Sequence, residues 1–167
     1  MKTKLGNVTK FAKGSQINGS DLSEDFAYPF LNGGVRPSGK WKAFNVKEHT
    51  VTISEGGNSC GYVNFMQTPF WCGAHCYYLY DAKCDEKYLF YALKSQERRL
   101  MCIRSGCCMP NIKKSDLAQF ELNIEDDRNK QAQVVHKLDS ISYVVEQRKT
   151  QLAQLDQLVK SRFVEAA

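Results

Sequence analysis

The last forty or so residues constrain the fold of this 167-residue chain more than any other part of it. No Gly or Pro occurs between Asp127 and Glu165, so nothing in this stretch breaks a helix. Apolar side chains recur there in steps of four and three residues, a heptad pattern interrupted at Arg148. The positions on this seam are Val134, Leu138, Ile141, Val145, Leu152, Leu155 and Val159.

A helix from about residue 127 to residue 165 would be about 60 Å long at 1.5 Å per residue. A domain of the size that remains is too small to cover such a helix along its whole length. We therefore expect part of the seam to pair with a second helix in an intermolecular coiled coil, which predicts a homodimer. The alternative is one amphipathic helix packed on its own domain, and the pattern alone leaves it open.

Residues 1–124 follow a different pattern, that of a globular domain with mixed α and β structure. The β-branched run at residues 50–54 predicts a strand that ends at Gly56-Gly57. Residues 62–65 are its expected hairpin partner, and residues 76–80 form a further strand. We therefore expect an α+β protein with two parts, a domain at 1–124 and a helical region at 125–167.

Two helices are predicted inside this domain. Asp85 is a good N-cap, and Leu89, Leu93 and Leu100 then recur on one face, which predicts one continuous helix. A short helix should start at Ser115 or Asp116, and residues 120–124 alternate like a final strand.

The charge distribution separates the same two parts. The net charge of the chain is +5. Residues 125–167 contain equal numbers of basic and acidic residues, so the whole excess lies in residues 1–124. If a polyanion binds this protein, it should bind the N-terminal part. The candidate DNA-contacting residues are polar or basic side chains in segments rich in Gly, Pro and Ser: Arg36, Lys40, Lys42, Lys47, Asn58, Arg104, Lys113 and Lys114. The alternative for each of them is an ordinary solvated surface.

Signatures of catalysis are missing from the sequence. There is no GxxxxGK[ST] phosphate-binding loop and no GxSxG nucleophile motif. Cys72 and Cys76 have a spacing that zinc sites use, whereas Cys107 and Cys108 are adjacent and do not, so we favour free thiols acting as small apolar residues. His75 could activate a neighbouring cysteine, although sequence neighbours rarely form such pairs. We expect no catalytic residue, no metal and no cofactor on this chain.

No apolar run is long enough to span a bilayer, and the first ten residues contain no apolar leader segment. The seven cysteines are an odd number and point to reduced thiols. These features predict a cytoplasmic protein with no membrane partner.

Several motifs, taken in chain order, resemble the DNA-specificity subunits of type I restriction–modification systems. They are Leu5-Gly6-Asn7-Val8 with Phe11 and Lys13-Gly14 (the opening strand and turn), Tyr28-Pro29-Phe30-Leu31-Asn32-Gly33-Gly34 with Pro37-Ser38-Gly39, Thr52-Ile53-Ser54-Glu55-Gly56-Gly57 with Gly61-Tyr62-Val63-Asn64 (a glycine-rich hairpin), Tyr88-Leu89-Phe90-Tyr91-Ala92-Leu93 (a helix), Ile112-Lys113-Lys114-Ser115-Asp116-Leu117, and the helical residues 145–149 and 155–163.

The resemblance implies a target-recognition domain that reads one half of a split double-stranded DNA site. It also implies a conserved helix that pairs with a second helix in an antiparallel coiled coil and so sets the distance between the two halves. Methyltransferase subunits would bring S-adenosylmethionine and the chemistry, and a restriction subunit with motor and nuclease activity could join them. Family members carry two recognition domains and two such helices, so we expect a half-length form with one of each. Two alternatives stay open, an inactive or stored specificity cassette of the same family and a small thiol- or zinc-dependent enzyme.

Overall fold

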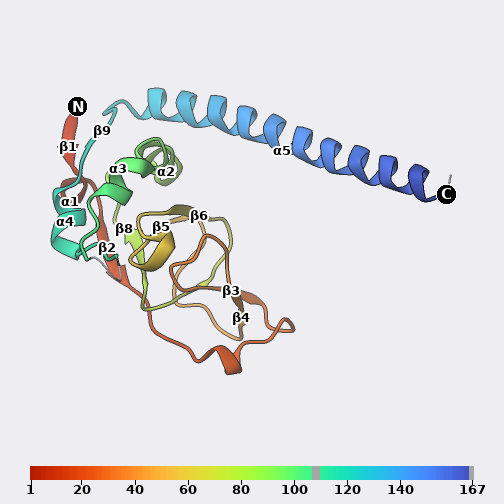
Figure 1. The fold of residues 1–167 in the computed structure, drawn as a ribbon. Coiled ribbons are helices and arrows are strands. Elements are labelled where there is room, and N and C mark those ends of the chain that lie inside the picture. The colour runs from red at the N-terminus through yellow and green to blue at the C-terminus, as the bar shows by residue number, and fades with distance from the viewer. Residues whose placement is uncertain (107–109, 166–167) are drawn as a thin grey trace. The chain divides into compact units, whose positions relative to one another are not determined.

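The computed structural model of the chain describes residues 1–106 and 110–165. The chain divides into two units, which are described separately: a first unit, Met1–Gln131, and a second unit that starts at Ala132. In Figure 1 the helices α1–α4 gather at one end of the first unit, and strands β3 and β4 lie at the other.

A four-stranded antiparallel sheet forms the centre of the first unit. Its order is β2 (Lys10–Lys13), β8 (Cys76–Tyr80), β5 (Thr50–Ser54) and β6 (Val63–Met66). Every residue of β5 is buried, as its β-branched sequence implies. The predicted hairpin of β5 with β6 and the predicted strand β8 are therefore confirmed.

Two smaller sheets flank the central one. In the first, β1 (Lys2–Lys4) pairs with β9 (Glu121–Asn123), and the expected final strand is confirmed. The second has the order β4 (Gly39–Trp41), β3 (Tyr28–Leu31) and β7 (Trp71–Cys72). Short 3₁₀ turns, η1 (Gly19–Asp21) and η2 (Gly57–Ser59), lie in the connections.

The helix that was predicted to start after Asp85 is present but shorter than expected. Asp85 caps α2 (Glu86–Lys94) by accepting a hydrogen bond from the backbone N–H of Tyr88, 2.8 Å away. The single helix expected through Leu100 is wrong, because a separate helix, α3 (Glu97–Cys102), carries that residue.

The break between α2 and α3 has a local cause at Ser95. Its hydroxyl donates to the carbonyl of Ala92, 2.8 Å away, and so competes for the acceptor that the next helical turn would use. The N–H of Gln96 bonds instead to the carbonyl of Leu93. Leu89, Leu93 and Leu100 are all fully buried in spite of the break, so the apolar face was correctly predicted.

Two further short helices complete the first unit. The helix expected at Ser115 or Asp116 is α4 (Lys114–Gln119), which buries Leu117. The segment that resembled an opening strand is instead a helical turn, α1 (Leu5–Val8), and the strand β2 follows it. Leu5 and Val8 are three residues apart and both buried, a spacing that a helical turn satisfies and an alternating strand does not.

The long helix α5 (Arg128–Glu165) has the predicted extent. Asp127 caps it, because its carboxylate accepts from the N–H of Asn129, 2.8 Å away. Most seam positions on this helix, Leu152 among them at 62% exposure, are solvent-exposed in the single chain. Pairing of this seam with a second helix remains a prediction. Within the part of the chain that the structure describes, every helix is too short or too polar to cross a bilayer.

Candidate functional site

A buried carboxylate, that of Glu55, joins four segments of the first unit at the end of β5. Glu55 is 5% exposed. Its carboxylate forms an ion pair with Lys13 at the end of β2. It also lies 3.7 Å from Nδ1 of His75, in the β7–β8 turn, and accepts a hydrogen bond from Nδ2 of Asn111 at 3.4 Å. Three side chains that are distant in sequence therefore converge on one acceptor.

Backbone hydrogen bonds hold the same segments together. The N–H of Glu55 donates to the carbonyl of His75 at 3.0 Å, and the N–H of Ile112 donates to the carbonyl of Glu55 at 2.9 Å. The positions of His75 and Asn111 therefore follow from the backbone as well as from their side-chain contacts.

The loop after β3 packs against this end of the sheet through Gly33. Its carbonyl accepts hydrogen bonds from the hydroxyl groups of Ser54 and Ser59. Gly33 has a φ of +84°, and a Cβ there would lie 2.3 Å from the carbonyl oxygen of His75, so only glycine fits. The contact brings the loop that carries Arg36 against the turn that carries Asn58.

We call the whole set of segments that meet around Glu55 and Gly33 the polar loop cluster. It comprises residues 13–16, 32–36, 55–59, 73–75, 104–106 and 110–113.

Half of the predicted DNA-contacting residues belong to the polar loop cluster. These four side chains are solvent-exposed: Arg36, Asn58, Arg104 and Lys113. The segments that carry Arg104 and Lys113 are linked by the antiparallel bridge between Ser105 and Asn111. Lys114 begins α4, where its Nζ lies 5.7 Å from the ring centre of Phe11.

The other predicted residues lie elsewhere on the first unit. Lys40, in β4, lies 3.5 Å from a carboxylate oxygen of Glu24. Nζ of Lys42 lies 5.2 Å from the ring centre of Trp41, within an aromatic group on the three-stranded sheet. Lys47 is at the opposite end of β5 from Glu55.

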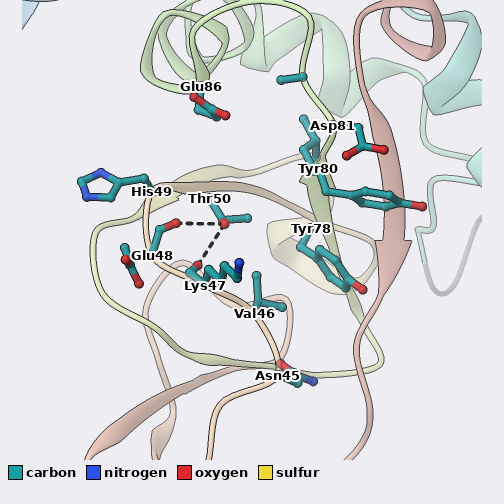
Figure 2. A pocket seen from close by; sticks show the side chains of 12 residues that line it. Asn45, Val46, Lys47, Glu48, His49, Thr50, Tyr78, Tyr80, Asp81 and Glu86 are labelled. Carbon is teal, nitrogen blue, oxygen red and sulfur yellow. Dashed lines mark hydrogen bonds between the residues drawn. The ribbon is translucent and has the colours of Figure 1, made fainter.

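The cavity beside Lys47 has a different chemical character (Figure 2). Its volume is about 580 Å³, and Tyr78 and Tyr80 form one wall. Glu48, Asp81 and Glu86 also line it, so carboxylates outnumber the single lysine. An acidic lining repels phosphate, and this cavity is a poor candidate for a DNA contact.

The five cysteines that the structure describes do not form the arrangements that nucleophilic catalysis or zinc binding would need. Cys72 and Cys76 are buried, and the hydrogen bond between them, together with burial, raises the pKa of the Cys72 thiol. The imidazole of His75 is exposed and lies near Glu55. Among residues 1–106 and 110–165, no group of three or more His, Cys, Asp or Glu side chains could hold a metal ion. Cys107 and Cys108 lie outside the described residues.

The sequence analysis missed Glu55, Lys13 and Asn111 as parts of a site and considered His75 only as a partner of cysteine. A signal was present at Glu55, where an acidic residue directly follows a strand of five buried residues. Its partners are up to 56 residues away in sequence, and only the fold brings them together.

Comparisons with known proteins agree with this fold. The sequence model of the type I restriction modification DNA specificity domain matches residues 1–157. A putative type I specificity subunit of Mycoplasma pneumoniae is 32% identical over 148 residues, which cover 87% of this chain and 39% of the relative. A putative type I specificity subunit of Mycoplasma genitalium is 31% identical over 140 residues, which cover 82% of this chain and 36% of the relative.

A solved structure is similar over the same region. The crystal structure of the type I restriction–modification system S subunit from M. genitalium superposes with a TM-score of 0.80 at 29% identity, over 87% of this chain and 40% of that one. The chain thus spans about two-fifths of the length of these relatives. Because the family match extends over nearly the whole sequence and the fold is shared, this chain belongs to the type I restriction modification DNA specificity domain family.

Proposed function

We propose that this chain supplies DNA sequence specificity to a type I restriction–modification system in the cytoplasm. The first unit binds one half of a bipartite double-stranded DNA target. The observation that carries this proposal is the family match over residues 1–157. It is supported by the charge distribution, because the whole positive excess of the chain lies in residues 1–124.

The helix α5 is the dimerisation and spacing element in this proposal. Two copies pair antiparallel through the seam and form a closed homodimer with two-fold symmetry. With 38 residues, α5 is about 57 Å long. Half-site centres about one DNA turn apart, roughly 34–36 Å, fit within that span. Two identical domains then read the same half-site on opposite strands, which gives an interrupted palindrome.

Methyl transfer belongs to the partner subunits. Methyltransferase subunits bind S-adenosylmethionine and dock on the dimer, and a restriction subunit can join the same assembly. This chain contributes binding and positioning and transfers no methyl group by itself. Purified protein incubated with DNA and labelled S-adenosylmethionine should therefore give only background label.

The decisive experiment is co-expression with the cognate methyltransferase, followed by co-purification and methylation mapping of the host genome. We expect the methyltransferase to be retained by the chain and an interrupted palindrome to be methylated. The double variant Leu152→Asp, Leu155→Asp is the matched control for the dimer. It should no longer direct methylation of the interrupted palindrome. An asymmetric or uninterrupted motif would contradict the homodimer. The specificity function would be contradicted if the chain does not retain the methyltransferase. It would also be contradicted if the methyltransferase methylates the same motif when this chain is not expressed.

A further inference from the structure

Three exposed side chains, those of Lys13, His75 and Asn111, surround the carboxylate of Glu55. The carboxylate is buried, and as an acceptor it can only receive hydrogen bonds. Its partners are far more accessible, because the side chains of Lys13 and His75 are 43% and 67% exposed, and Asn111 is also exposed. Each of these three side chains therefore contacts the Glu55 carboxylate and is also exposed to solvent.

The carboxylate also fixes the direction of the Asn111 amide. Only the Nδ2 end of that amide can donate to Glu55, so the oxygen end must point elsewhere. The backbone of Asn111 is held as well, since its N–H and carbonyl both pair with Ser105. After the bond to Glu55 the amide still has one N–H and its oxygen for other partners, and the Asn111 residue is exposed to solvent. A pair of one donor and one acceptor matches N7 and the N6 amino group of adenine in the major groove.

The ion pair between Lys13 and Glu55 favours a role in orienting a neighbouring side chain over a role in attracting phosphate. Lys13 is neutralised by Glu55, so this lysine adds little to a general attraction for phosphate. An ion pair with one buried partner is also weak grounds for a purely stabilising role, because apolar residues of similar volume often stabilise a protein as much as a desolvated charge pair does. The arrangement is better suited to orienting Asn111, with Lys13 and His75 beside it.

We propose that Asn111 reads an adenine in each half of the DNA target and that Glu55 is the positioning residue that orients its amide. Lys13 and His75 flank this contact and hold the Glu55 carboxylate in place beside Asn111. The inference rests on the proposed DNA-specificity function and goes further, since it assigns a base contact to one residue of the polar loop cluster.

The test uses the full chain with its methyltransferase and compares the wild type with Asn111→Ala, Glu55→Ala and the double variant. Asn18→Ala is the control, because this exposed asparagine has no side-chain capping hydrogen bond. Methylation mapping first defines the wild-type motif. Competition binding then measures the preference for adenine over the other bases at each motif position, at several salt concentrations.

We expect Asn111→Ala to relax one adenine position, with about a 5- to 150-fold loss of preference there and an unchanged salt slope. Glu55→Ala should relax the same position, and the double variant should add nothing further, because Glu55 acts through Asn111. The control should keep the full motif.

Two results would overturn the inference while the proposed function stands. One is an unchanged motif in Asn111→Ala when the wild type methylates a specific motif. The other is an equal loss of affinity for all sequences, which indicates a structural role. If Glu55→Ala does not fold, as judged by circular dichroism, Asn111→Ala alone decides the base contact. A wild-type protein that directs no specific methylation would overturn both proposals.

Discussion

The side chain of Gln131 connects the start of α5 to the rest of the first unit and gives a sharp test of the fold. Gln131 is 2% exposed. Its oxygen accepts from the backbone N–H of Asp85 at 2.9 Å, and its Nε2 donates to the carbonyl of Glu125 at 2.6 Å. Substitution by Ala leaves both backbone groups without this partner. Each orphaned buried group costs about 1–3 kcal/mol. Because Asp85 and Glu125 are only half-buried, water recovers part of that cost, and we expect a loss of about 2–3 kcal/mol in the free energy of unfolding.

Thermal unfolding followed by tryptophan fluorescence measures this loss. The two tryptophans, Trp41 and Trp71, both lie in the first unit, so the signal reports on that unit and not on the second. The expected decrease in Tm is about 6–12 °C for a unit of this size. Gln133→Ala is the control, because this neighbouring glutamine is exposed and its substitution should have little effect. Equal Tm values for the two variants would refute the role assigned to Gln131.

Three further outcomes are expected. Leu152→Asp places a charge on the exposed seam and should prevent the proposed dimer from forming, as measured by light scattering, whereas Gln154→Asp should not. A stable wild-type monomer at high concentration would contradict the pairing. Burial raises the pKa of the Cys84 thiol to about 11 while Cys102 is exposed, so iodoacetamide near neutral pH should label Cys102 much faster in peptide mass spectrometry, and similar rates would be a contradiction. Burial, with a contribution from nearby Glu55, raises the pKa of Tyr77 to about 12, above its value of about 10 in the unfolded chain. The stability that this shift provides is therefore complete below about pH 10 and is lost as the pH rises towards 12, so urea unfolding across that range should show a steeper decline for the wild type than for Tyr77→Phe.

The elements that could be predicted from the sequence are those set by local chemistry. The strand β5 follows from a run of β-branched residues, and the start of α2 follows from Asp85 as its cap. The extent of α5 follows from a heptad pattern free of Gly and Pro. The break between α2 and α3 was missed because it depends on the hydroxyl rotamer of Ser95, which an apolar pattern does not encode.

The candidate site was less predictable than the fold. Exposed basic residues can be found by composition, and four of the eight predicted DNA-contacting residues do share the polar loop cluster. Their contact with DNA stays a prediction. Glu55 could not be assigned a role, because its partners Lys13, His75 and Asn111 come from three other segments. Sequence patterns describe neighbours within an element, whereas this site depends on pairing between elements.

The pairing of β1 with β9 has a consequence for the order in which the protein is made. Lys2 lies opposite Asn123, so β1 leaves the ribosome before its partner strand, which is synthesised about 120 residues later. At typical rates of about 5–20 residues per second, that delay is about 6–24 s. During this time β1 is an unpaired edge, and its two lysines discourage pairing with a neighbouring nascent chain. Lys2 then forms a 2.7 Å ion pair with Glu121 once β9 has been synthesised. The lysine that disfavours pairing of β1 with another nascent chain therefore also stabilises the completed sheet.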